Sequence, residues 1–228
     1  MPGPLPCAAS TLVSPVLGTQ ARWVEAARTR VSVHYETGEP AIPVVCVGMP
    51  EAVRLPYGVV VSELPAPGPV GLVARRWWCP DRPSGLTPAS GSTWTRWLHE
   101  DSPGLSDPPD PAVLLGRGAG LTPDGDDVLA GMLVAASALG DPRLPAWRAA
   151  TKAALATRRT TAVSVGMLHA ALDGWAASPL AAAVRALCGP DDPTPAVDAL
   201  LAVGSSSGRA LLDGVLYVLA TGTVEGAA

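Results

Sequence analysis

A glycine-rich segment with three carboxylates, GRGAGLTPDGDD at positions 116–127, is the part of this sequence best suited to chemistry. Glycine lets a backbone adopt positive φ angles and lets a ligand approach the main chain closely. The amides of such a loop can converge on one anion, and the start of the following helix also favours negative charge. The segment therefore predicts a bound phosphate or carboxylate. The expected contacts are Gly116, Arg117, Gly118, Gly120, Thr122 and Gly125.

The three aspartates of this segment need a separate explanation, because they would repel a bare anion. Aspartate is ordinary in the first turn of a helix, where it caps amides and compensates the dipole. A Mg²⁺ ion that bridges carboxylate and phosphate is one alternative, and a carboxylate that acts as a base or orients a substrate amide is another. We expect Asp126 and Asp127 to be catalytic. Asp124, Asp126 and Asp127 are the candidate ligands for Mg²⁺, the one cofactor considered.

Named nucleotide motifs do not describe the segment, since it lacks both the GK[ST] ending of the Walker pattern and a true GxGxxG. Two later stretches have related character: RRTTAVS at 158–164 and GSSSGRALLDG at 204–214. Each is a hydroxyl-rich helix start, for which simple N-capping is the plainer interpretation. If the three helix starts meet, they form a pocket of amides and hydroxyls. The further binding residues expected from these stretches are Arg159, Thr160, Ser206, Ser207 and Gly208.

The elements that must position these residues fall into two groups. Short valine-rich runs separated by turn residues predict strands at 30–36, 42–49, 58–64 and 70–77, in an antiparallel sheet or small barrel. The apolar run AVLL at 112–115 is expected to be a strand that leads into the glycine-rich segment. From about Thr122 the apolar spacing becomes helical, with breakers that divide it into six helices near 122–139, 144–157, 160–178, 179–189, 195–204 and 207–222.

The expected fold is therefore α+β: a β-rich N-terminal sheet or small barrel followed by an all-helical C-terminal part. We expect a β-rich subdomain at 1–78, a Pro-rich connecting loop at 79–111 with a short helix at 92–100, and the glycine-rich loop with the helical subdomain at 112–228. A loop as long as the connecting one is usually functional or disordered.

Composition narrows the class of protein. The 228 residues are 48% hydrophobic, enough for a sizeable core, and the net charge is −4 without any long Lys/Arg cluster, so nucleic acid is not an expected partner. The four cysteines form no CxxC pair and are expected to be free thiols. No basic, apolar leader begins the chain, and no apolar run approaches the roughly 20 residues that span a bilayer. A cytoplasmic protein without a membrane partner is expected.

The histidines, His34, His99 and His169, are isolated in sequence, so none has a visible catalytic partner. His169 is the best of the three because it lies on the helix that follows RRTT. No Ser-His-Asp or Cys-His arrangement can be assigned from the sequence.

The pattern GxGxGLTPxGDDxLxG, followed by a hydroxyl-rich helix start and a late GxxSGxxxLxG, resembles a bacterial family long labelled as a domain of unknown function. Its members include a subunit of oxamate carbamoyltransferase. The resemblance covers roughly 111–220 and rests on the residues from Gly116 to Gly131 and from Gly204 to Gly214. The chain departs from the family pattern at Asp124, where a small serine is expected, and at Arg209 and Ala210, where an acidic residue is expected.

The resemblance implies an enzyme or enzyme subunit of carbamoyltransferase type, from a multi-subunit assembly that handles carbamoyl phosphate and oxamate. We therefore expect the loop Gly116–Asp127 to bind a phosphate- or carboxylate-bearing small molecule, and the chain to form homo- or hetero-oligomers with other enzyme subunits. The alternative is a non-catalytic assembly or effector-binding subunit, in which the same loop is a structural cap or an effector site.

Overall fold

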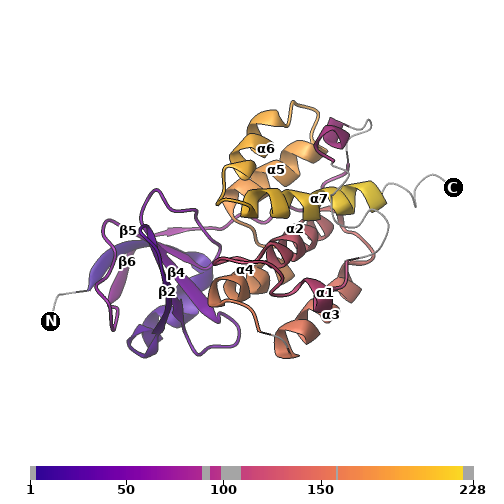
Figure 1. Cartoon of the computed structure of the whole chain (residues 1–228). Coiled ribbons are helices and arrows are strands. Elements are labelled where there is room, and N and C mark those ends of the chain that lie inside the picture. Colours follow the sequence, from indigo (N-terminus) through magenta and orange to yellow (C-terminus); the bar gives the residue numbers. More distant parts are fainter. Residues whose placement is uncertain (1–3, 89–92, 99–108, 158, 223–228) are drawn as a thin grey trace.

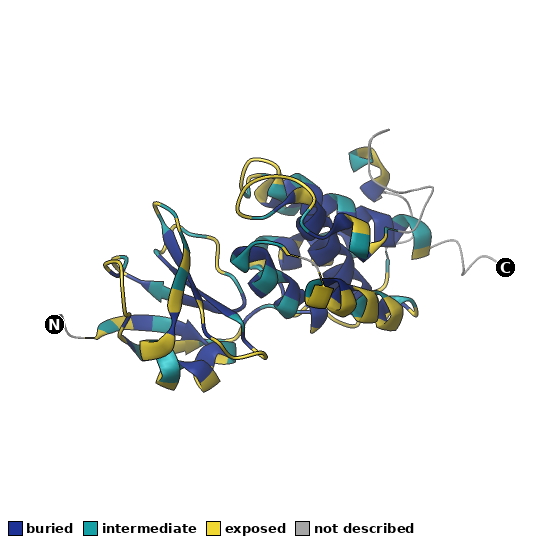
Figure 2. Ribbon diagram, turned by 60° about the horizontal axis from the view of Figure 1, so that its bottom comes forward, coloured by how far each residue is buried: buried dark blue, intermediate teal, exposed yellow. Residues whose placement is uncertain are grey.

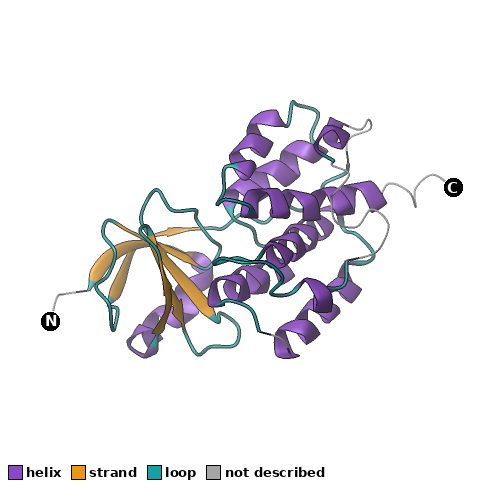
Figure 3. Cartoon of the chain, viewed as in Figure 1, coloured by secondary structure: helices purple, strands orange, loops and turns teal. Residues whose placement is uncertain are grey.

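The computed structural model describes residues 4–88, 93–98, 109–157 and 159–222. Within them the chain forms an N-terminal sheet and a C-terminal set of helices that lie side by side (Figure 1, Figure 3). The α+β prediction is confirmed, and of its two β forms the open sheet is present. The predicted short helix at 92–100 is the 3₁₀ helix η2 (Thr93–Trp97), and His99 lies outside the described residues.

In the part of the chain that the structure describes, six strands make up the sheet, in the spatial order β2-β3-β4-β5-β1-β6. Their bounds are β1 Leu5–Ser10, β2 Val24–Arg28, β3 Ser32–Glu36, β4 Val44–Gly48, β5 Gly58–Val61 and β6 Leu72–Trp78. The pairs β1–β6 and β4–β5 are parallel and the others antiparallel. The prediction of an antiparallel sheet was therefore wrong: the sheet is mixed, because β1 lies between β5 and β6 and runs parallel to β6.

Two of the strands, β1 and β2, were not predicted. Their sequences, LPCAAS and VEAAR, hold few of the β-branched and aromatic residues that favour strands. Both become strands through pairing, β1 with two neighbours and β2 at the sheet edge against β3. Tertiary context overrides local propensity at these two places.

The two faces of the sheet have different roles. On one face Val33, Tyr35 and Val47 pack in a core with Val13 and Val16 of the 3₁₀ helix η1 (Thr11–Arg22). The other face carries alternate residues of the β3–β4 hairpin, in which His34 pairs with Cys46 and Ser32 with Gly48. Because side chains alternate along a strand, this second face is available to the helices and to the site described below.

Within the described ranges, the helical part consists of seven α-helices. They are α1 Pro111–Leu114, α2 Asp124–Leu139, α3 Leu144–Thr157, α4 Ala162–Leu172, α5 Ser178–Cys188, α6 Thr194–Leu201 and α7 Ser207–Gly222. The strand expected at 112–115 is instead α1, because Asp110 accepts a hydrogen bond from the Ala112 amide and Pro111 occupies the first turn. None of the helices in the described ranges is long and apolar enough to cross a membrane.

Helix α2 is the centre of this part, because nearly all of its residues are buried. Figure 2 shows the buried interior of the helical part in dark blue. Helix α2 packs closely against α7 through two glycines. A Cβ on Gly131 would lie 2.1 Å from the Leu211 carbonyl oxygen, and a Cβ on Gly214 would lie 2.1 Å from the Val128 carbonyl oxygen. The two backbones therefore meet at a distance that only glycine permits.

Helix α4 joins the two parts of the molecule. Its Ala170 lies in the core of the sheet, whereas Leu168 and Leu172 lie in the core of the helices. Gly166 lets it approach β4, since an added Cβ would be 3.1 Å from Val44 Cβ. The second face of the sheet is thereby held next to the starts of α2 and α7.

Candidate functional site

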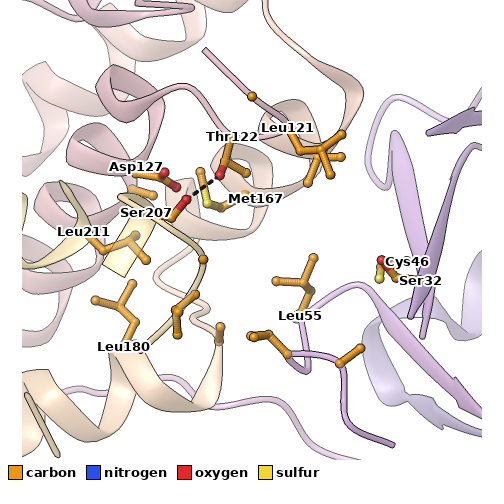
Figure 4. A pocket seen from close by; sticks show the side chains of 18 of the residues that line it. Ser32, Cys46, Leu55, Leu121, Thr122, Asp127, Met167, Leu180, Ser207 and Leu211 are labelled. Carbon is orange, nitrogen blue, oxygen red and sulfur yellow. Dashed lines mark hydrogen bonds between the residues drawn. The ribbon is translucent and has the colours of Figure 1, made fainter. Parts of the chain in front are cut away.

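A cavity of about 490 Å³ lies between the sheet and the helices (Figure 4). This volume is in the range of pockets that bind small molecules. Its walls are mostly apolar and include Leu55 from the sheet side and Leu121, Met167, Leu180 and Leu211 from the helical side. Polar groups gather at two ends, one at the starts of α2 and α7 and one on the sheet.

Asp127 is the carboxyl group at the helical end. Its side chain is 1% exposed, lines the cavity, and has no hydrogen-bond partner at Oδ2. Burial raises the pKa of Asp127 to about 7, and the hydroxyls of Ser207 and Thr122 offset only part of that effect. A buried carboxyl that is close to half-protonated near neutral pH can both accept and donate a proton, as an acid–base group must.

Two hydroxyls accompany Asp127. The Oγ atoms of Thr122 and Ser207 are 2.8 Å apart, and both residues line the same end of the cavity (Figure 4). Ser205, Ser206 and Ser207 also bring the N-terminus of α7 to the cavity. The amides of a helix start and its dipole favour negative charge. This end of the cavity therefore combines a carboxyl of raised pKa with a helix start of positive polarity.

The three hydroxyl-rich helix starts do meet. Thr122 contacts Ser207, the Ser206 hydroxyl donates to Asp124 at 2.6 Å, and the Thr161 hydroxyl at the start of α4 donates to the Leu121 carbonyl. The capping interpretation also applies at α4, where the Thr161 oxygen accepts from the Ser164 amide at 3.1 Å. No side chain caps α2 in this way.

Asp126 faces away from the cavity and is tied up by protein groups. One of its oxygens accepts from the Gly116 amide at 2.7 Å, and the other accepts from the Thr160 hydroxyl. Its side chain is fully buried and does not line the cavity. Asp126 thus ties the glycine-rich loop to the start of α4. This arrangement gives Asp126 a structural role, and of the three aspartates only Asp127 lines the cavity.

The donor set does not fit a magnesium ion. Asp124 is bonded to Ser206, Asp126 to Gly116 and Thr160, and Asp127 faces the cavity, so the three carboxylates have separate partners. Across the described part of the chain, no group of three or more His, Cys, Asp or Glu side chains could hold a metal ion. No step is therefore assigned to a metal.

The glycines of the loop separate into three kinds. Gly116 and Gly118 have φ angles of 73° and 120° and lie against backbone atoms of Arg159 and Asp124, so they shape the loop. Gly125 is a close-approach glycine, 2.1 Å from the Leu114 oxygen at its Cβ position. Gly120, with φ of 91°, has open space beside it and lines the cavity. Of the four, Gly120 is the one placed to let a ligand reach the main chain.

Several other predicted contacts lie apart from the cavity. Arg117 and Arg159 are exposed and do not line it. Thr160 lines a separate pocket against the loop after β3, and Gly208 is buried against the Leu200 carbonyl. Among the described residues that line the cavity, none is Lys or Arg. Any anionic group bound there would be met by amides and hydroxyls.

The sheet end of the cavity was not predicted from the sequence. Ser32, His34 and Cys46, which we call the sheet-end cluster, all line the cavity and are buried. His34 Nε2 is 3.3 Å from Ser32 Oγ and 3.9 Å from Cys46 Sγ. Burial lowers the pKa of His34 to about 4 and raises the pKa of Cys46 to about 12, so both groups are neutral near pH 7. The signal that could have revealed the cluster is the hairpin register, which pairs position 34 with position 46.

Fold and site together have the features of a small-molecule-binding protein: a concave, mainly apolar cavity with a few convergent polar groups and one carboxyl with a strongly shifted pKa. Residues 114–219 match the model of a family described as oxamate carbamoyltransferase subunit AllH. The match spans just under half of the chain, from the end of α1 into α7, and includes Thr122, Asp127 and Ser207 but none of the sheet. No solved structure matches the chain.

Proposed function

We propose that this protein is an enzyme subunit of carbamoyltransferase type, and that its small-molecule substrate binds in the cavity between the sheet and the helices. The observation that carries the proposal is the buried Asp127 side chain, which lines the cavity and whose Oδ2 lacks a hydrogen-bond partner. A buried polar atom without a hydrogen-bond partner destabilises the fold, so its presence calls for an explanation such as a catalytic role. Asp127 lies within the residues that match the carbamoyltransferase subunit model.

The chemistry of carbamoyl transfer suits the groups at this end. An amide or amine nitrogen attacks the carbonyl carbon of the carbamoyl donor, a new C–N bond forms, and the bond from that carbon to the leaving group breaks. The attacking nitrogen must lose a proton, and the Asp127 carboxylate is the group available to accept it. The Thr122 and Ser207 hydroxyls can donate to the developing oxyanion or to an anionic part of the substrate.

An anionic substrate is compatible with this end of the cavity despite the absence of Lys and Arg from the described lining. The carboxylate or phosphate would be held by the start of α7, by the serines at 205–207 and by the open backbone beside Gly120. The proposed ligand is still anionic, as the sequence suggested, but its proposed contacts are uncharged donors in place of Arg117 and Arg159.

A ligand-dependent melting experiment tests the proposal. The full chain is melted with carbamoyl phosphate, oxamate or inorganic phosphate, alongside Asp127→Asn and, as a matched control, Asp198→Asn on the exposed face of α6. We expect at least one of these compounds to raise the Tm of the wild type and of Asp198→Asn but not of Asp127→Asn. Equal stabilisation of all three proteins, or of none, contradicts the proposal.

Assembly with other enzyme subunits is part of the same proposal, because the matching family is described as a subunit. If the compounds bind the chain and transfer occurs only after a partner subunit is added, the chain contributes the substrate site to a larger enzyme. If partners assemble normally with Asp127→Asn and activity is unchanged, the non-catalytic assembly role replaces the catalytic one.

A further inference from the structure

The polar groups on the sheet wall of the cavity are not used by the function proposed above. Ser32, His34 and Cys46 come from adjacent strands, and their side chains reach the same cavity as Asp127. In Figure 4, Ser32 and Cys46 lie across the cavity from Asp127 and Ser207, with Leu55, Leu121 and Met167 between the two ends. The cavity thus has two polar ends and an apolar middle.

We infer that the sheet-end cluster is a second hydrogen-bonding subsite, and that the ligand is an amphipathic carboxamide whose far end carries an uncharged hydrogen-bonding group. The inference rests on the proposed function, because it takes the cavity to be the substrate site. It deepens that function by assigning a substrate class and by giving the sheet part of the selectivity.

The electrostatic character of the cluster supports an uncharged partner. Thr29, Ser32, His34 and Cys46 are the polar side chains that the sheet side contributes to the cavity, and none carries a charge near neutral pH. A neutral imidazole, a hydroxyl and a thiol can donate and accept hydrogen bonds. Unlike the α7 end, the cluster itself has no helix start whose amides and dipole offset the desolvation cost of an anion. A hydroxyl, carbonyl or amide on the ligand meets these limits.

The volume and walls of the cavity support an apolar body in the ligand. At about 490 Å³ the cavity is in the range used by drug-sized ligands, whereas oxamate is only a few atoms long. Burial of apolar ligand surface against Leu55, Leu180 and Leu211 contributes roughly in proportion to area. The carboxamide end places its N–H groups at Asp127, as carbamoyl transfer requires.

The sheet wall is also the part of the site that the family comparison leaves open. The match to the carbamoyltransferase subunit model begins at residue 114, so Ser32, His34, Cys46 and Leu55 lie outside it. The Asp127 end accordingly carries the chemistry shared with that family, and the sheet end carries the selectivity of this chain.

Histidine signals of the intact protein provide the test, because the chain has only three histidines. Phenylacetamide and its para-hydroxy analogue are titrated into the full chain, and the imidazole signals are followed in proton–carbon correlation spectra. The His34 signals are assigned from Cys46→Ala, which alters the surroundings of that ring. We expect both amides to shift the His34 signals and leave those of His169, which faces a different groove, unchanged.

Affinity supplies the second readout. The para-hydroxy compound should bind up to about tenfold more tightly than phenylacetamide, the value of one good hydrogen bond, and His34→Phe should remove that difference. Failure of both amides to bind or to shift the His34 signals, while oxamate or carbamoyl phosphate still stabilises the protein through Asp127, overturns the subsite and leaves the proposed function standing. If no compound binds the wild type in a way that depends on Asp127, both the subsite and the proposed function are overturned.

Discussion

The Asp126 carboxylate accepts a hydrogen bond from the backbone amide of Gly116 at 2.7 Å, and this bond joins the first turn of α2 to the loop ten residues before it. The other oxygen of Asp126 accepts from the Thr160 hydroxyl, so one buried side chain holds together the glycine-rich loop, α2 and the approach to α4. The neighbouring Asp127 has no such partner at Oδ2. The two adjacent carboxylates thus differ in their hydrogen bonding.

Replacing Asp126 with alanine should destabilise the protein by about 1–3 kcal/mol, because the Gly116 amide and the Thr160 hydroxyl lose their acceptor. Urea denaturation measures the change. The control is Asp198→Ala on the exposed surface of α6, which should stay within about 0.5 kcal/mol of the wild type. Equal free energies of unfolding for the two variants would show that the hydrogen bonds of Asp126 do not stabilise the fold.

The α2–α7 contact predicts a steric penalty at its glycines. Gly214→Ala should cost about 1–3 kcal/mol or more, since the new methyl group would lie 2.1 Å from the Val128 oxygen and the helices would have to separate. Gly18→Ala is the matched control because nothing lies within 4 Å of its Cβ position. Thermal unfolding should distinguish the two, and a fully stable Gly214→Ala protein would contradict the packing described for α2 and α7.

The shifted pKa of Asp127 predicts a dependence of stability on pH. An unfolded aspartate titrates near pH 3.9, whereas burial raises the pKa of Asp127 in the folded state to about 7. Between these values the folded protein holds a proton that the unfolded chain has released. Stability from this group is therefore fully present below about pH 4, falls as the pH rises toward about 7, and is flat above that value.

Asp127→Asn removes this titration, so the wild type should lose stability relative to the variant as the pH rises from about 5 to about 8. Denaturation curves for both proteins across the range measure the difference, in which all other titrating groups cancel. A difference that stays constant with pH would mean that Asp127 titrates normally in the fold.

The hydroxyl pair beside Asp127 predicts an effect on binding. Thr122→Val and Ser207→Ala should each lower the affinity for the cavity ligand by about three- to tenfold, because each removes one hydrogen-bond donor from the helical end of the cavity. Thr122→Ser keeps the hydroxyl and serves as the control. Calorimetric titration with whichever compound stabilises the wild type gives the affinities, and unchanged values for Thr122→Val would place the ligand elsewhere.

The helices were largely predictable because their signals are local. Gly140, Asp141 and Pro142 end α2 as expected, and α3 has the bounds that its apolar spacing predicted. The strands β1 and β2 could not be found in this way, since their sequences hold few strand-forming residues. The partners of β1 are also distant in the chain, whereas β2 pairs with the next strand, β3.

The sequence left open whether the hydroxyl-rich helix starts meet, and it did not reveal the lining of the cavity. Hydroxyl-rich helix starts suggested a shared pocket, and the contacts between Thr122 and Ser207 and between Thr161 and Leu121 confirm that the starts meet. Asp126 and Asp127 could not be told apart in sequence, although successive residues on a helix point about 100° apart. Which of the two faces a cavity depends on α4 and α7, and the contribution of the sheet depends on a register that composition does not reveal.

A crystal structure of the protein soaked with oxamate and carbamoyl phosphate tests the central claim most directly. We predict ligand density inside the cavity, with a ligand atom about 2.6–3.2 Å from Asp127 Oδ2 and hydrogen bonds to Thr122 or Ser207. Density on the exposed surface at Arg117 or Arg159, with the cavity free of ligand, would contradict the assignment of Asp127 as the group that meets the substrate.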